Sequence, residues 1–128
     1  MGSQQQLLII VGVLMVGLSI AIGITLFVDS ASASNRDAIA SDLENHAARA
    51  RVFQKRPRYL GGGGGSFVGF QLSSGSVRNS NGEFSVHDAN ATSVIIEGIG
   101  HEIGYDRTSP VKVAMTVSAD TMTVAELN

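Results

Sequence analysis

The sequence contains no cysteine, which excludes disulfides, thiolate metal ligands and cysteine nucleophiles. It has no tryptophan, two tyrosines and five phenylalanines, so any globular core is small. Neither sign of charge dominates, because nine Lys and Arg accompany eleven Asp and Glu, and no general attraction to nucleic acid or anionic lipid is expected. A small domain without disulfides is marginally stable alone, and oligomerisation is one route to stability.

Charge is also absent from one long stretch. Leu7–Val28 contains no charged residue, and its only polar members are Ser19 and Thr25. As a helix it would be roughly 33 Å long at 1.5 Å per residue, enough to cross a bilayer core of about 30 Å. Three interpretations are open: a cleaved secretory signal, a permanent single-span anchor, and a helix that lies first in a membrane and then in the core of a polymer.

The residues on either side of this stretch, and the glycines within it, help to distinguish the three interpretations. Ala31-Ser32-Ala33 offers a signal cleavage site, but the stretch exceeds the usual apolar region of a signal, and the leading MGSQQQ has no basic side chain. Gly12, Gly17 and Gly23 favour the polymer, because small residues let helix backbones approach closely. Each glycine also weakens a helix by up to about 1 kcal/mol relative to alanine.

After Val28 the pattern becomes that of an amphipathic helix. A group of acidic residues precedes a group of basic ones, as suits the helix dipole: Asp29, Asp37, Asp42 and Glu44, and then Arg49, Arg51, Lys55 and Arg56. Pro57 ends the helix. The expected helix runs from about Gln4 to Arg56. Its apolar stripe, which we expect to be buried under a sheet, consists of Ile39, Leu43, Ala47, Ala50 and Phe53.

The remainder is rich in glycine and in short β-type runs. The five glycines Gly61–Gly65 are predicted to be a flexible or tightly turning linker, because no Lys-Ser/Thr pair follows them as in a phosphate-binding loop. Turn residues then separate candidate strands, which are Phe67–Leu72, Glu83–His87, Ser93–Ile99, Val111–Ser118 and Met122–Glu126. The predicted fold class is α+β: a long helix, apolar in its first half and amphipathic in its second, packed against a small C-terminal antiparallel sheet.

This organisation divides the chain into four segments. We expect an apolar membrane or filament-core helix at 1–28, its amphipathic continuation at 29–58, a glycine-rich linker at 59–66 and the antiparallel sheet at 67–128.

The sequence does not match the motifs for catalysis and metal binding with which we compared it. The histidines His46, His87 and His101 lack the paired helical spacing of a zinc motif, and no Gly-x-Ser-x-Gly elbow occurs. The oxygen-bearing residues around Asp106 do not have the spacing of a calcium loop. The basic run Arg49–Arg58 is read as a solvated helix end. We therefore expect no enzyme activity, no metal and no cofactor, and no nucleic-acid partner. Asn90-Ala91-Thr92 makes Asn90 a candidate glycosylation acceptor.

The plan of the chain resembles that of type IV pilins. The residues that carry the resemblance are the run from Leu7 to Val13, continuing through Leu26-Phe27-Val28, and then Asn35–Ile39. The resemblance implies a subunit made as an inner-membrane protein, clipped by a prepilin peptidase and assembled into a helical extracellular filament. Such filaments serve adhesion, motility, DNA uptake or secretion. The implied partners are further copies of the chain and the assembly machinery.

The implied assembly contacts lie in the apolar helix. They are expected at Gln5, Leu7, Leu8, Ile9, Ile10, Gly12, Val13, Leu14, Gly17, Gly23 and Phe27. Pilins usually have a glutamate near the start of this helix, thought to neutralise a neighbour's terminal amine. Here the residues are Gln4-Gln5-Gln6, and Gln5 can hydrogen-bond an amine but carries no charge. The alternatives are a pseudopilin of a secretion apparatus, a single-span receptor or accessory domain, and a small membrane-anchored enzyme.

Overall fold

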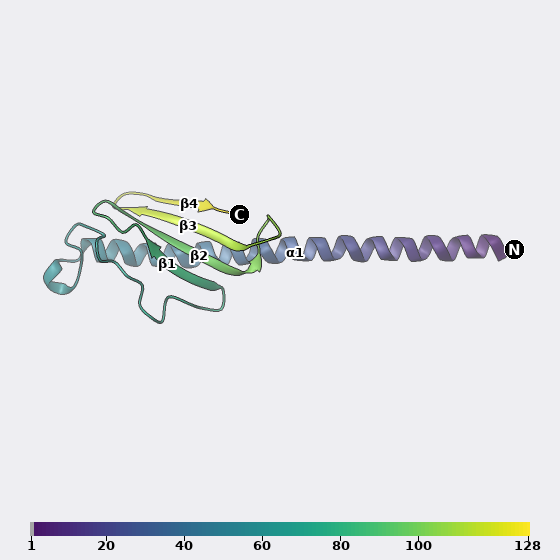
Figure 1. Ribbon diagram of the computed structural model, residues 1–128, viewed down its shortest axis with the longest axis horizontal. Coiled ribbons are helices and arrows are strands. Elements are labelled where there is room, and N and C mark those ends of the chain that lie inside the picture. Colours follow the sequence, from purple (N-terminus) through teal and green to yellow (C-terminus); the bar gives the residue numbers. More distant parts are fainter. Residues whose placement is uncertain (1) are drawn as a thin grey trace. The chain divides into compact units, whose positions relative to one another are not determined.

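The computed structural model describes residues 2–128 (Figure 1). The first element, α1, is a single α-helix over Gly2–Lys55, and a short 3-10 helix, η1, follows at Arg58–Leu60. No proline interrupts the chain before Pro57, which lacks a backbone N–H and disfavours helix in the residue before it. The expected helix is thereby confirmed. The chain divides between Ala31 and Ser32 into two units, which are described separately.

Four antiparallel strands form the sheet of the second unit. They are β1 (Gly82–His87), β2 (Ser93–Ile103), β3 (Pro110–Ser118) and β4 (Met122–Glu126), and they lie in the order β1-β2-β3-β4. Each strand therefore pairs with its neighbour in sequence, and Figure 1 shows the sheet alongside the later part of α1. The predicted α+β fold, a long helix packed against a small antiparallel sheet, is confirmed.

The core lies between this part of α1 and one face of the sheet. Ile39, Leu43, Ala47 and Ala50 of the predicted stripe are fully buried. Alternate residues of β2 and β3 face them, and these residues are Val94, Ile96, Val111, Val113, Met115 and Val117. Phe67, Phe70 and Phe84 complete this core. Burying one large apolar side chain contributes about 1.5–3 kcal/mol, so this cluster is the main source of hydrophobic stabilisation in the unit.

Helix and sheet approach each other closely at Gly98 of β2. A Cβ atom at this position would lie 2.6 Å from Cγ2 of Ile39 and 3.1 Å from the ring of Phe84. The position therefore requires glycine, because any side chain would push α1 away from the sheet.

Phe53, the last residue of the predicted stripe, differs from the other four. It is half-buried and lies at the margin of the core, where its ring centroid is 5.6 Å from that of Phe70. The prediction that Phe53 is buried under the sheet is wrong. Its position near the end of α1 places it against the loop that follows the glycines.

The predicted strand Phe67–Leu72 is also wrong. This segment forms a turn in which the Phe70 N–H donates to the Phe67 carbonyl at 3.0 Å and Gly69 has a φ of +86°. Phe67 and Phe70 are both buried while Val68 is exposed. Apolar residues three apart can share one face of a turn, whereas strand residues three apart point to opposite faces.

The glycine run turns tightly back onto the end of α1. Four consecutive backbone N–H groups, from Gly62 to Gly65, donate to carbonyls of Pro57, Phe53, Arg56 and Gln54 at 2.7–3.1 Å. These bonds satisfy carbonyls that the end of a helix leaves without partners. Three of the glycines have positive φ, and a Cβ at Gly62 or Gly63 would collide with the backbone. Of the two predicted forms of linker, the structure contains the tight turn.

Candidate functional site

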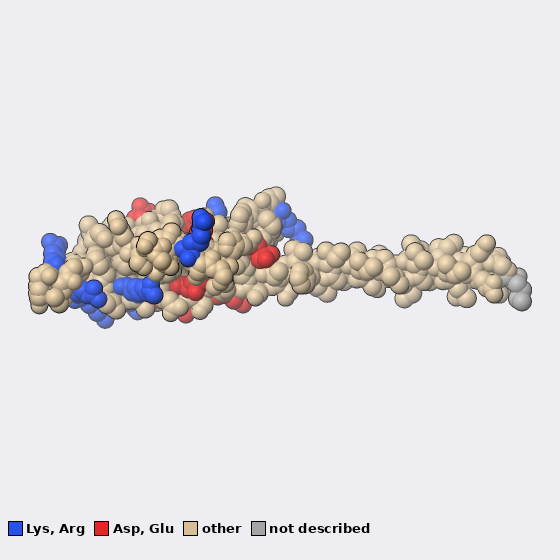
Figure 2. All heavy atoms as spheres, turned by 90° about the horizontal axis from the view of Figure 1, so that it is seen from below, with Lys and Arg blue, Asp and Glu red and all other residues tan. Residues whose placement is uncertain are grey.

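The apolar segment of α1 is the first candidate. From Leu7 to Phe27 its large apolar side chains are all more than half exposed, and Figure 2 shows no Lys, Arg, Asp or Glu along this part of the chain. By length and composition the helix can cross a membrane. The molecule therefore has a long apolar N-terminal helix that is compatible with membrane insertion.

The polar groups of this segment are satisfied within the helix itself. Ser19 Oγ donates to the Met15 carbonyl at 2.8 Å, and Thr25 Oγ1 donates to the Ala21 carbonyl at 3.0 Å. Apolar surroundings penalise unpaired polar groups by several kcal/mol. The segment can thus enter a lipid or protein environment without leaving either hydroxyl unpaired.

The glycines of this segment lie in continuous helix. A Cβ atom at Gly12, Gly17 or Gly23 would meet nothing within 4 Å in the described chain. Contacts within these residues thus give no reason for glycine at the three positions, although each lowers helix stability. The other predicted assembly residues, from Gln5 to Phe27, lie exposed along the same helix.

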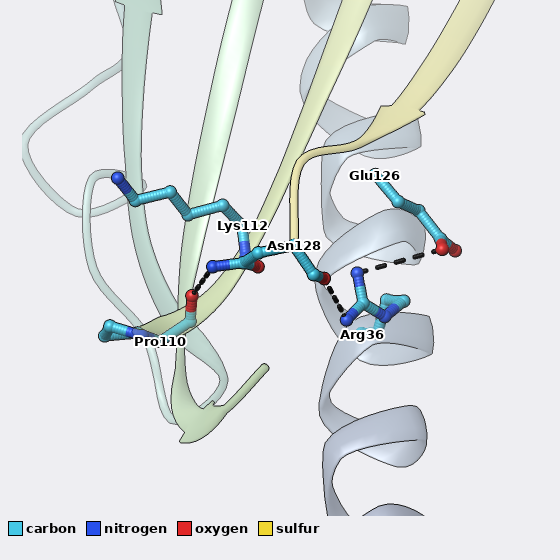
Figure 3. Close-up of polar contacts among 5 residues, drawn as sticks. All are labelled: Arg36, Pro110, Lys112, Glu126 and Asn128. Atoms are coloured by element: carbon cyan, nitrogen blue, oxygen red, sulfur yellow. Dashed lines mark hydrogen bonds and ion pairs between the residues drawn. The ribbon is translucent and has the colours of Figure 1, made fainter. Parts of the chain in front are cut away.

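A second candidate is a polar cluster around Arg36, which is 3% exposed (Figure 3). Its guanidinium donates to the backbone oxygen of Asn128, lies 3.8 Å from a carboxylate oxygen of Glu126, and stacks 4.3 Å from the ring centroid of Tyr105. Figure 3 shows Arg36 reaching from α1 to the segment that follows β4. The cluster joins parts of the chain that are 92 residues apart in sequence.

The side chain of Asn128 completes this cluster. Its Nδ2 donates to the Pro110 carbonyl at 2.6 Å and to Ser109 Oγ at 2.7 Å, and its Oδ1 accepts from the Lys112 N–H at 2.8 Å. Together with the bond from Arg36, these contacts fasten the residues after β4 to α1 and to β3. The sequence did contain a signal for Arg36, because it falls three residues before Ile39 on the buried stripe.

His46 is a third candidate, since it is 6% exposed and neither ring nitrogen has a hydrogen-bond partner among the described residues. Its ring makes an edge contact with Phe84, with centroids 4.8 Å apart. Burial, then the charge of Arg49, lowers the pKa of His46 below its ordinary value of 6.5, and Asp42 opposes this shift. His46 also lines a polar hollow of about 300 Å³ beside Asp42, Arg49 and Ser76. The ring of His46 thus forms part of the packing of α1 against β1.

Asp42 has a structural role beside it. One carboxylate oxygen accepts from the side-chain amides of Asn79 and Asn81, at 2.9 and 2.8 Å. These bonds hold the loop before β1 against α1.

The residues considered for metal binding do not converge. His87 is hydrogen-bonded to Ser85 at 3.0 Å, and His101 is exposed on β2. Hydrogen bonds from Ser109 and Thr108 lower the pKa of Asp106 to about 2. Among residues 2–128 no three His, Asp or Glu side chains are grouped as metal ligands.

Asn90 lies in the exposed connection between β1 and β2. Its Oδ1 accepts from the backbone N–H groups of Thr92 and Ser93 at 2.9 and 2.8 Å. The side chain therefore shapes this turn, a role for which asparagine is suited without any modification.

An apolar hollow of about 490 Å³ lies where the end of α1 faces the 67–72 turn. Its lining is Ala48, Arg49, Val52, Phe53, Arg56, Gly69, Phe70 and Gln71. Arg49 and Arg56, which are seven residues apart in sequence, thus border a largely apolar surface. Sequence reasoning did not identify this hollow, because one of its walls is the segment predicted to be a strand.

Comparison of the chain with models of protein families, with curated proteins and with solved structures finds no significant match.

Proposed function

We propose that this protein is the structural subunit of a helical extracellular filament, resembling a major type IV pilin. The observation that supports this most strongly is the segment Leu7–Val28: it is helical, uncharged and exposed, and its two hydroxyls are bonded internally. A surface of this kind needs an apolar environment. In a membrane, and later against further copies of the same helix, it would have one.

The rest of the chain fits the same proposal. A small α+β unit with a core of few side chains would line the outside of the polymer, and association would add to its modest stability. The glycines Gly12, Gly17 and Gly23, which no contact within the described chain requires, would allow helices of neighbouring copies to approach. The precursor would reside in the inner membrane and the assembled form on the cell surface.

The function would then depend on many copies of the same surface along the filament rather than on a catalytic site. Each copy adds one sheet to the filament surface, and many weak contacts made together bind strongly. Adhesion, motility or another surface interaction would use this surface.

The deciding experiment is electron microscopy of material sheared from cells that produce the full chain, with antibodies against the second unit. We expect thin fibres that carry the label along their length. If the chain instead stays entirely with the membrane fraction and no labelled fibre forms, the protein is a single-span anchored domain and the proposal is wrong.

A further inference from the structure

Four exposed charges on α1, or directly after it, lie in two rows in the second unit. Asp37 and Glu44 form an acidic row. Arg49 and Arg56 form a basic row: Arg56 directly follows the last residue of α1, and its N–H donates to the Val52 carbonyl at 3.0 Å, as in one more helical residue. Members of a row are seven residues apart, so they lie on one side of the helix and roughly 10.5 Å apart. The two rows and the buried stripe are spaced about 120° around the helix axis. Figure 2 shows, on the face it presents, Lys and Arg gathered towards the end of α1.

All four side chains are exposed, and none forms an ion pair in the part of the chain that the structure describes. Arg49 donates to Ser76 Oγ at 2.6 Å, which directs this guanidinium without neutralising it. Each row can therefore pair with charges of another molecule.

The basic row borders the apolar hollow. Arg49 and Arg56 line it together with apolar residues, which include Val52, Phe53 and Phe70. A ligand that fits needs two carboxylates about 10 Å apart with small side chains between them. The acidic row has this arrangement, because Ala40 and Ser41 lie between Asp37 and Glu44.

We infer that the acidic row of one copy docks on the basic row and apolar hollow of a second copy. This inference rests on the proposed function, in which copies lie side by side with their helices parallel. The contact is heterologous, since two different surfaces meet, and so it continues from copy to copy.

The charges also determine the stagger, which is the shift along the helix axis between the two copies. A shift of twelve residues, about 18 Å along the helix, sets Asp37 beside the second copy's Arg49 and Glu44 beside its Arg56. Ala40 and Ser41 then face the hollow at Val52 and Phe53. With a shift of five residues Glu44 would lie beside the second copy's Arg49, but Asp37 would lie beside its Asp42. Like charges placed together cost free energy. The twelve-residue shift pairs both acidic residues with the basic row, and it is therefore preferred.

A charge exchange in the full chain tests the pairing. Glu44→Lys and Arg56→Glu should each lower fibre yield roughly tenfold or more, because an attraction becomes a repulsion at every contact. The combined variant should recover most of the yield. Lys55→Glu is the matched control: it makes the same charge change one residue away on a different side of α1 and should assemble normally. Thermal melts of all variants check that the second unit still folds.

Cysteine pairs test the stagger, because the chain has no cysteine of its own. Ser41→Cys with Val52→Cys should yield ladders of disulfide-linked copies in oxidised fibres. Within one copy these positions are about 16 Å apart along α1, beyond the reach of a disulfide. Ser34→Cys with Val52→Cys, misplaced by about six residues, should remain monomeric under denaturing conditions.

The outcomes separate the two proposals. If the unmodified chain forms no fibres, the proposed function is wrong and this contact is wrong with it. If fibres form, but the charge exchange does not restore yield or the Ser34 pair links as well as the Ser41 pair, the filament stands and the inferred contact is overturned.

Discussion

At the residue scale, the polar side chains of Arg36 and His46 are buried beside the core of the second unit. The ring of His46 packs against Phe84, and burial is the main cause that lowers its pKa and so favours the neutral form. In the unfolded chain its pKa returns to about 6.5. The unfolded state therefore binds the proton first as pH falls, and the contribution of neutral His46 is present above pH 6.5 and lost below it.

We predict that the unfolding midpoint of the protein falls as pH is lowered from 7 to 5. His46→Phe, which keeps an aromatic ring beside Phe84 but cannot take up a proton, should make this fall smaller. Thermal unfolding followed by circular dichroism at several pH values measures both. His87→Gln, on an exposed position of β1, should retain the full dependence. Identical pH dependence in the His46→Phe variant and the unmodified protein would contradict the prediction.

Asn128 provides a second prediction at this scale. Asn128→Ala removes three side-chain hydrogen bonds to Ser109, Pro110 and Lys112. Since leaving a partly buried donor or acceptor unpaired costs about 1–3 kcal/mol, we expect a loss of that order in the free energy of unfolding. Denaturant titration measures it.

Arg78→Ala is a suitable comparison. It breaks the exposed ion pair with Glu83 and should cost at most about 1 kcal/mol. Equal effects of the two substitutions would show that the cluster around Arg36 does not hold the end of the chain.

At the scale of elements, the glycine run ends α1 and carries the chain back along it. Gly63→Ala should destabilise the second unit by more than Gly61→Ala, because a Cβ at Gly63 collides with the Ser66 backbone and lies 3.0 Å from the Phe53 ring, whereas Gly61 has open space around it. Gly61→Ala should still cost about 1 kcal/mol, since its φ is +82°. Thermal melts of the two variants test this order. A freely flexible linker would tolerate both changes equally.

Most of the elements were predictable from the sequence because their patterns are periodic. The stripe through Ile39 and Leu43 recurs at helical spacing, and the alternation from Val111 to Val117 has the period of a strand with one buried face. Each pattern arises because one element packs against one surface. It can therefore be recognised in the sequence even when the rest of the fold is not known.

The remaining features depend on contacts between distant segments. Phe67 and Phe70 look like strand residues by composition, and only their burial on one side of a turn distinguishes them. Arg36 has the chemistry of a surface residue, yet its partners are Asn128 and Glu126 at the far end of the sequence. The hollow beside Arg56 is likewise formed by two segments whose meeting no local pattern specifies.

At the scale of the whole molecule, two kinds of surface have to be reconciled. The first unit is uncharged from Leu7 to Val28, whereas the second carries most of the charges of both signs. The proposed polymer accommodates both: apolar helices associate without water, and charged rows set the stagger where water is present. Affinity and register would then come from different parts of the same chain.

Gly17 gives the sharpest test of this division. In the isolated chain a larger side chain at Gly17 has open space, and leucine is a better helix former than glycine, so Gly17→Leu should leave the helix and the second unit intact. In the polymer the same change would overpack a close helix contact, which typically costs 1–3 kcal/mol. We therefore predict normal folding and membrane insertion but a strong loss of fibres, measured by circular dichroism, membrane fractionation and electron microscopy.

Two smaller changes serve as controls. Gly17→Ala should cause an intermediate loss of fibres. Val16→Leu should cause only a small loss, because it adds one methylene at a position already occupied by a side chain. Normal fibre yield from Gly17→Leu would mean that this face of the helix is not in contact with another copy, and the apolar segment would then serve as an anchor rather than as the core of a filament.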